Sequence, residues 1–320
     1  MNYSQSVLCP VDFSKSSRGA LRYAATIAAH VGGRLTLLAV NDPLVGEAAE
    51  LTGGKARLVD DTIREMKKFF GQSLSAGATA FGEVQFEVAS GKPAAEILRV
   101  SREHGCDLIV MASHGATGFR KLFFGSTTER VLRETVVPML VTPGGDPGPM
   151  EFDDLRKRIH RVLVPVDLSA ATLHQLVIAC GLAEALSSPL LLLHVIEPVR
   201  SVMAAQAAFP TVETERRYRV ESELERVATA MPAGMKPEAL VAYGEPSEEI
   251  AKVAHDRDAG LIVMGLHSSP LVGPRMGSVT YRVLCLAHTL VLALPPEPVR
   301  LQRDPVDTAV CTTAPVSHRK

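Results

Sequence analysis

Residues 107–131 read DLIVMASHGATGFRKLFFGSTTERV. The apolar run Leu108–Ala112 predicts a buried strand, and the pattern from Thr127 onward predicts a helix. A strand, a glycine-containing loop and a helix start can present backbone N–H groups and a helix N-terminus to an anion. An ordinary strand–turn–helix connection with a capped helix explains the same residues. Both interpretations stay open on this stretch alone, because short motifs often match without a function.

The same succession of features occurs twice along the chain. Three pairs of segments carry the repeat: PVDFS at 10–14 and PVDLS at 165–169, GKP at 91–93 and GEP at 244–246, and LIVM at 108–111 and 261–264. Asp12 and Asp167 are 155 residues apart, and Gly125 and Gly277 are 152 apart. Matching features in one order at a nearly constant offset indicate a duplicated domain.

Each copy alternates five predicted strands with four predicted helices. This alternation predicts an α/β fold with two repeated doubly wound domains, each a five-stranded parallel sheet with helices on both faces. The predicted divisions are a first domain at 1–143, a linker at 144–158, a second domain at 159–296 and a disordered tail at 297–320. Ligands of such sheets bind where the strand order reverses. Asp12 and the loop after Ala112 would share that crevice if the first and fourth strands are neighbours.

The composition narrows the class of partner. The net charge of −1 gives no attraction to nucleic acid or to an anionic membrane. The absence of tryptophan disfavours stacking platforms for single-stranded nucleic acid. Apolar runs such as 189–196 are too short to span a bilayer, and no signal peptide is visible. Five cysteines without a CxxC spacing predict reduced thiols and a cytoplasmic protein.

Together the motifs resemble those of a tandem universal stress protein, with both copies covered. The resemblance rests on the two PVD segments, the GKP and GEP turns, and the pairs LIVMASHG…GSTTERVL and LIVMGLHS…GSVTYRVL. It implies a stress-response role and doubly wound domains that often dimerise through the last strand. Two domains in one chain would form such a pair internally, and a further homodimer stays open. The resemblance also implies that one subclass binds ATP and another does not.

The first copy fits the ATP-binding pattern of that family, which is Gly, two residues, Gly, nine residues, Gly and then Ser or Thr. Ala112, Gly115, Gly125 and Ser126 stand at the four places, so only the first glycine differs. The resemblance implies ATP, alone or with Mg²⁺, in the first domain. The implied contacts are Asp12 to the adenine amine, Val40 to the adenine edge, Met111 and Ala112 to the ribose, and His114, Gly115, Gly125, Ser126 and Thr127 to the phosphates.

The chemistry of these residue types agrees, because a carboxylate accepts from an exocyclic amine and bare amides receive an anion. Asp12 as a plain turn residue is the alternative, since aspartate is common at strand ends. In the second copy Gly265, Ser268, Gly277 and Ser278 stand at the four places. That loop is one residue shorter and contains two prolines, which lack N–H donors. We expect a weakened or structural site there, around Asp167.

Three functions fit the sequence: a nucleotide-dependent regulator, a scaffold or chaperone-like module that binds no nucleotide, and a slow ATPase. No catalytic residue is assigned, because no carboxylate partner for His114 or His267 can be identified from sequence. Walker A, GxGxxG and GxSxG motifs and metal-binding histidine spacings are absent. The many charges at 213–226 predict a solvated helix face with i,i+4 ion pairs.

Overall fold

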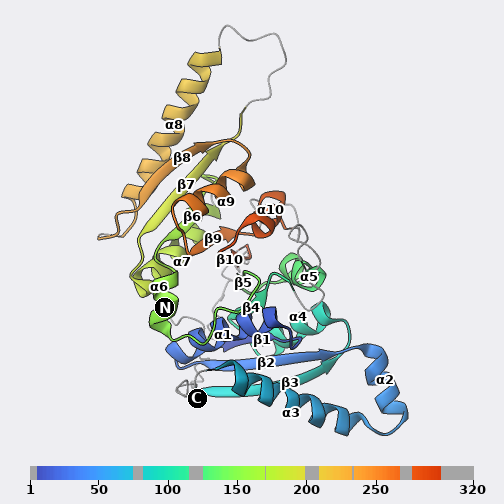
Figure 1. Ribbon diagram of the computed structural model, residues 1–320. Coiled ribbons are helices and arrows are strands. Elements are labelled where there is room, and N and C mark those ends of the chain that lie inside the picture. Colours follow the sequence, from blue (N-terminus) through green and yellow to red (C-terminus); the bar gives the residue numbers. More distant parts are fainter. Residues whose placement is uncertain are drawn as a thin grey trace, which may run out of the picture.

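The computed structural model describes residues 6–74, 82–114, 125–169, 171–198, 209–232, 234–266 and 276–296 (Figure 1). The strands of the first half are β1 (Ser6–Pro10), β2 (Arg34–Asn41), β3 (Glu83–Ser90), β4 (Leu108–Ala112) and β5 (Met139–Thr142). Its helices are α1 (Lys15–His30), α2 (Pro43–Leu51), α3 (Lys55–Ser73), α4 (Pro93–Glu103) and α5 (Ser126–Glu134). The tail at 297–320 lies outside the described residues.

A short helix, α6 (Phe152–Arg158), leads into the second half. The strands there are β6 (Val162–Pro165), β7 (Leu190–Ile196), β8 (Glu238–Tyr243), β9 (Leu261–Gly265) and β10 (Leu290–Leu294). The helices are α7 (Ala171–Leu186), α8 (Phe209–Thr229), α9 (Pro246–Asp256) and α10 (Ser278–Leu286). Among the described residues, no helix is both long and apolar enough to cross a bilayer.

The ten strands of the described residues form one sheet in the order β3-β2-β1-β4-β5-β10-β9-β6-β7-β8. The pairings within each half are parallel. The strand order reverses between β1 and β4, and again between β6 and β9. The predicted fold of two doubly wound, parallel five-stranded domains is therefore confirmed, and the first and fourth strands of each half are neighbours.

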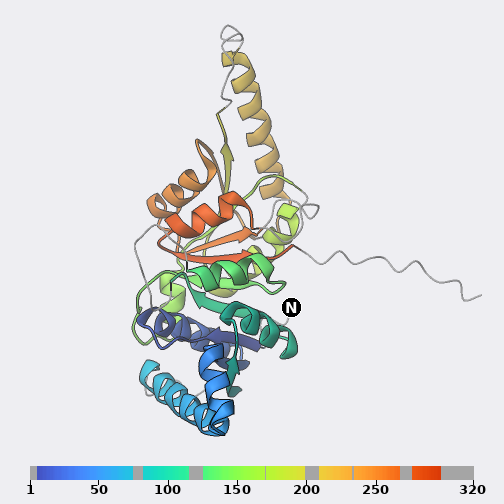
Figure 2. The same cartoon turned by 90° about the vertical axis from the view of Figure 1, so that its right-hand side faces the viewer.

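Helices cover both faces of the sheet, because successive side chains of a strand point to opposite sides. Along β1, Val7 and Cys9 enter a core that includes Leu21 of α1. Leu8, between them, enters a separate core that includes Ile97 of α4. Burial on both faces accounts for the continuous apolar runs in the strand sequences. Figure 2 shows the two halves stacked along the long axis of the molecule, with α8 at one end.

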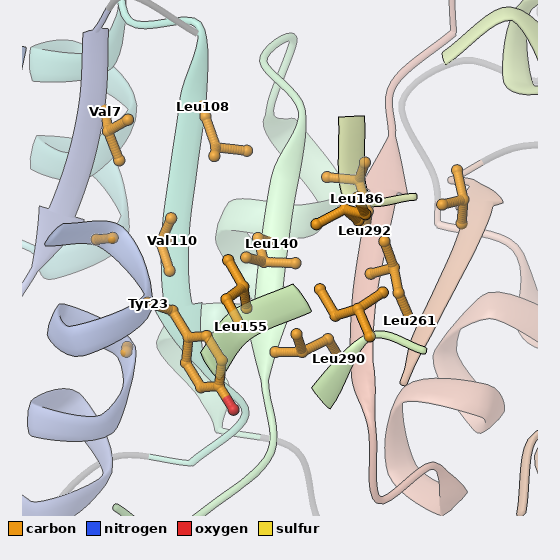
Figure 3. Close-up of a cluster of buried hydrophobic side chains, with 14 of the residues drawn as sticks. Val7, Tyr23, Leu108, Val110, Leu140, Leu155, Leu186, Leu261, Leu290 and Leu292 are labelled. Atoms are coloured by element: carbon orange, nitrogen blue, oxygen red, sulfur yellow. The ribbon is translucent and has the colours of Figure 1, made fainter. Parts of the chain in front are cut away.

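The two halves join through their last strands, β5 and β10. These pair antiparallel, with Val141 opposite Val291 and Leu140 opposite Leu292. Leu140 and Leu292 are buried in the core that contains residues of both halves (Figure 3). The predicted pairing of the two domains within one chain is thus present as a shared sheet.

The linker packs on α1 and forms a helix that the sequence pattern did not predict. Its contacts on α1 are an ion pair from Arg22 to Asp146 (3.0 Å), a hydrogen bond from Thr26 to the Met150 carbonyl (3.2 Å) and a ring stack of His30 on Phe152 (3.4 Å). Arg156 of α6 donates to the carbonyl of Leu186 in α7 (3.2 Å). The linker therefore contacts the first helix of each half, α1 and α7.

Replacing Gly19 by alanine tests this packing. Alanine normally stabilises a helix interior by about 0.5–1 kcal/mol relative to glycine. A Cβ on Gly19 would lie 2.2 Å from the Gly145 carbonyl oxygen, so the linker would have to shift. We expect Gly19→Ala to lower the free energy of unfolding by about 1–3 kcal/mol in urea titrations. The matched control is Gly71→Ala in α3, where a Cβ meets nothing within 4 Å. Equal stabilisation by both substitutions would contradict the packed linker.

Candidate functional site

A pocket of about 400 Å³ opens at the carboxyl ends of β1, β2 and β4, beside the reversal of strand order in the first half. Eight of the nine residues singled out from the sequence line it: Asp12, Val40, Met111, Ala112, His114, Gly125, Ser126 and Thr127. The ninth, Gly115, lies outside the described residues. The chain thus brings residues separated by more than one hundred positions to one crevice, because parallel strands end at the same edge.

Asp12 follows β1 and is held by its own turn. Its Oδ1 accepts from the backbone N–H of Ser14 at 3.1 Å. The Ser14 hydroxyl in turn caps α1 by accepting from the N–H of Ser17 (3.1 Å). Phe13, between them, has φ +60°, a conformation that costs most residues about 1 kcal/mol. Asp12 therefore does serve as a turn residue, and it also lines the pocket.

The start of α5 also lines the pocket. This helix has nine residues, and its N-cap, Gly125, provides no side-chain cap. The Thr128 hydroxyl donates to the Ala112 carbonyl at 3.0 Å, which fastens the first turn of the helix to the end of β4. The first N–H groups of a helix have no intrahelical partner and carry partial positive charge. Gly125, Ser126 and Thr127 therefore present positive partial charge to the pocket.

Most of the other residues that line the first pocket are apolar. Sequence reasoning assigned no site role to ten of the lining residues: Pro10, Val11, Phe13, Ser17, Leu38, Ala39, Asn41, Pro93, Ile97 and Thr128. Pro93 and Ile97 belong to α4. The GKP turn at the start of this helix was the sequence feature that could have indicated that α4 contributes to the pocket. Lys92 of the same turn does not line the pocket in the described part of the chain. Within the described residues, no group of three His, Cys, Asp or Glu side chains is arranged to hold a metal ion.

The second half has a pocket of about 450 Å³ at the corresponding place. Asp167, Met264 and Gly265 line it, but Gly277 and Ser278 are not among its described lining residues. Asp167 repeats the turn of Asp12, with its Oδ1 accepting from the Ser169 N–H at 2.9 Å and Leu168 at φ +59°. Ser268 lies outside the described residues. The second pocket is therefore as large as the first and is lined differently at the helix end.

The repeat and the strand order agree with the match to a protein-family model. A model described as the Universal stress protein family matches residues 4–143 and 158–295. The chain belongs to the universal stress protein family. Membership places it among stress-response proteins, and the two matched segments correspond to the two halves of the sheet.

Known universal stress proteins resemble one half of this chain at a time. One from Methanocaldococcus jannaschii is 30% identical over 143 residues, which cover 44% of this chain and 82% of that protein. YxiE of Bacillus subtilis is 31% identical over 142 residues, which cover 42% of this chain and 96% of YxiE. These relatives therefore have about the length of a single domain of this tandem universal stress protein.

Two solved structures match both halves together. A Pseudomonas aeruginosa PAO1 protein described as functionally unknown has TM-score 0.63 at 19% identity, over 92% of this chain and 94% of its own. A universal stress protein from Archaeoglobus fulgidus DSM 4304 has TM-score 0.62 at 20% identity, over 92% of this chain and 98% of its own. The likeness concerns the fold, in which two universal stress protein domains follow one another in a chain.

Proposed function

We propose that the first domain of this tandem universal stress protein binds one adenine nucleotide, ATP with or without Mg²⁺, and that the chain acts in the stress response as a nucleotide-dependent regulator. The observation that carries the proposal is the first pocket, whose lining combines an aspartate, many apolar residues and an uncapped helix N-terminus. Adenosine phosphates carry groups that complement this lining: an amine, a flat ring with a sugar, and anionic oxygens.

In this proposal Asp12 accepts from the adenine amine, and the backbone at Val40 meets the ring edge. Met111 and Ala112 lie against the ribose. The phosphates are held by Gly115, Gly125, Ser126 and Thr127, with His114 beside them. The His114 Nδ1 lies 2.9 Å from the Ser113 hydroxyl, which orients its ring at the pocket wall. Backbone N–H groups and a helix N-terminus suit phosphate because both present positive partial charge.

The oligomer proposed from the family resemblance needs a surface other than the last strand. β5 and β10 pair with each other, so each already occupies the edge of the other. A cytoplasmic location remains our expectation from the cysteines, of which Cys9, Cys106 and Cys180 are buried and form no disulfide. Burial raises the pKa of the Cys9 thiol, which keeps it protonated and unreactive.

Exchanging Asp12 for asparagine tests the adenine end. Asparagine can keep the acceptor for the Ser14 N–H, but its amide N–H₂ would then face the adenine amine, donor against donor. We expect Asp12→Asn to weaken ATP binding about tenfold or more in calorimetric titrations, as for loss of a charged hydrogen bond. The matched control is Asp42→Asn, because Asp42 makes the same kind of turn to the Leu44 N–H (2.8 Å) and does not line the described pocket. Equal ATP affinity of wild type and Asp12→Asn protein would remove Asp12 from the site.

A scaffold that binds no nucleotide is the competing function, motivated by Ala112 at the first place of the family pattern. It predicts that ATP leaves the melting temperature unchanged, whereas a ligand at 100 times its Kd stabilises the fold by about 2.7 kcal/mol. A slow ATPase is distinguished by turnover that Asp12→Asn protein loses. Turnover that survives this substitution would belong to a contaminant.

A further inference from the structure

The pocket of the second domain differs chemically from that of the first at three positions on one side. Gln175 of α7 lies eight residues after Asp167, where the first domain has Ala20 eight residues after Asp12. His194 of β7 stands where β2 has Ala39, since Leu193 and Leu38 pair with equivalent prolines. Arg216 of α8 lines the second pocket, whereas no described residue of α3 lines the first.

Gln175 closes the crevice between the two central strands of the second domain. Its side-chain N–H₂ donates to the carbonyls of Pro165 (2.7 Å) and Val263 (2.8 Å), at the ends of β6 and β9. Gln175 is almost fully buried. The second pocket extends to β7 and α8, and its described lining from α10 includes Val279 and Thr280 of the first turn but not Gly277 or Ser278.

The second pocket is lined by several side chains that can accept hydrogen bonds. The His194 Nδ1 is 2.9 Å from the Val166 carbonyl, which can only accept, so Nδ1 must carry the proton of a neutral ring. In the neutral ring Nε2 is then an acceptor, and the hydrogen bonds among the described residues include none at this atom. The carboxylates of Asp167 and Glu197 line the same pocket. A cationic amine suits the acidic residues Asp167 and Glu197.

The same pocket contains one guanidinium. Arg216 donates through Nη1 to the backbone carbonyl of Glu197 at 2.8 Å, which fixes the side chain over the pocket. No carboxylate pairs with Arg216 among the residues with described positions, whereas the next residue, Arg217, pairs with Glu221. A guanidinium with unused donors matches the oxygens of a carboxylate.

The charged residues that line the second pocket favour some classes of anionic ligand over others. The described lining has two acidic residues, Asp167 and Glu197, against one guanidinium, so a polyphosphate would meet more negative than positive charge among these side chains. A ligand with one cationic and one anionic group meets complementary charge at both. The remaining wall, with Leu193, Ile250 and Met264, is apolar.

We propose that the second domain is a separate small-molecule site for a zwitterionic amino compound, such as a free amino acid with an apolar side chain. The ammonium group lies toward Asp167 and His194, the carboxylate toward Arg216, and the side chain against the apolar wall. A pocket of about 450 Å³ has room for such a ligand. This site does not depend on nucleotide binding in the first domain.

The test titrates the full chain, with and without saturating MgATP, with L-leucine, L-methionine and L-phenylalanine by calorimetry and ligand-observed NMR. Each amino acid is compared with its carboxamide, which lacks the carboxylate, and with its N-acetyl derivative, which lacks the ammonium group. We expect at least one amino acid to bind, and both of its derivatives to bind at least about tenfold more weakly. No binding at millimolar concentration, or equal binding of acid and carboxamide, overturns the proposal.

Two substitutions locate the binding. Arg216→Gln and Asp167→Asn should each weaken amino-acid binding about tenfold or more. Arg217→Gln is the matched control, because Arg217 is adjacent on α8 and pairs with Glu221 outside the described pocket. The circular dichroism and melting temperature of each variant without ligand verify that it is folded. Unchanged affinity in folded Arg216→Gln protein, or competition of ATP with the amino acid for this pocket, also overturns the proposal.

Discussion

Gly125→Asp protein is expected to lose ATP binding while keeping its fold. Gly125 is the N-cap of α5, has an ordinary φ of −62° and provides no side-chain cap. Aspartate is among the favoured N-cap residues, because its carboxylate accepts from the first N–H groups of the helix. In the proposed site those N–H groups hold phosphate. The new carboxylate would occupy them and repel the phosphates, so we expect affinity to fall about 100-fold or more.

Calorimetry of both proteins with MgATP measures this loss, and thermal unfolding without nucleotide measures the fold. A Cβ on Gly125 would lie 3.3 Å from the Ser113 carbonyl oxygen, so a small adjustment is needed and the melting temperature should change little. The matched control is Gly277→Asp, which places the same cap at the start of α10 in the second half. It should leave ATP affinity unchanged. Full ATP affinity in folded Gly125→Asp protein would exclude the α5 N-terminus from the site.

Leu292→Ala is expected to destabilise the whole molecule by about 2–5 kcal/mol. Leu292 lies on β10 opposite Leu140 of β5 and is 7% exposed, in a core to which both halves contribute. Removing its buried methyl groups leaves a cavity at the joint between the halves (Figure 3). Denaturant unfolding followed by circular dichroism gives the loss in free energy.

The control for this loss is Leu173→Ala, because Leu173 of α7 is 68% exposed and surface substitutions usually change stability by less than about 0.5 kcal/mol. A double-mutant cycle with Leu140→Ala tests the contact across the joint. Residues in contact couple by about 0.5–3 kcal/mol, whereas distant residues are additive. Additive effects of the two leucines would argue that the halves fold as independent units.

The fold could be predicted from sequence because the repeat supplied each signal twice. The LIVM strands and the glycine-started helices recur at matching places, so a doubtful element in one copy was supported by its counterpart. Helix α2 has no counterpart among the residues described in the second half, and it was missed. Its apolar Leu44 and Leu51 are exposed, so the segment lacks the one-sided pattern of a packed helix. Helix α6 was missed because its seven residues follow a run of glycine and proline and are mostly charged.

The candidate site could be predicted where residues stand at strand ends, because strand order fixes their relative places. Asp12 follows β1 and Ala112 is the last residue of β4, and these two strands are neighbours in the sheet. The positions contributed by helix faces could not be predicted. Arg216 was included in a charged face expected to be solvated, and the i,i+4 pair of Arg217 with Glu221 agrees with that expectation. Arg216 itself lines the second pocket, because the packing of α8 on β7 and β8 sets which side chains turn inward.

The central claim is that the two domains differ, with a nucleotide site in the first alone. Its most direct test is the number of MgATP molecules bound per chain, measured by calorimetry on protein stripped of nucleotide by unfolding and refolding. The account predicts one molecule per chain, and none in Gly125→Asp protein. Two equivalent sites per chain would show that the second pocket also binds ATP, and no binding to the wild-type chain would favour the scaffold function.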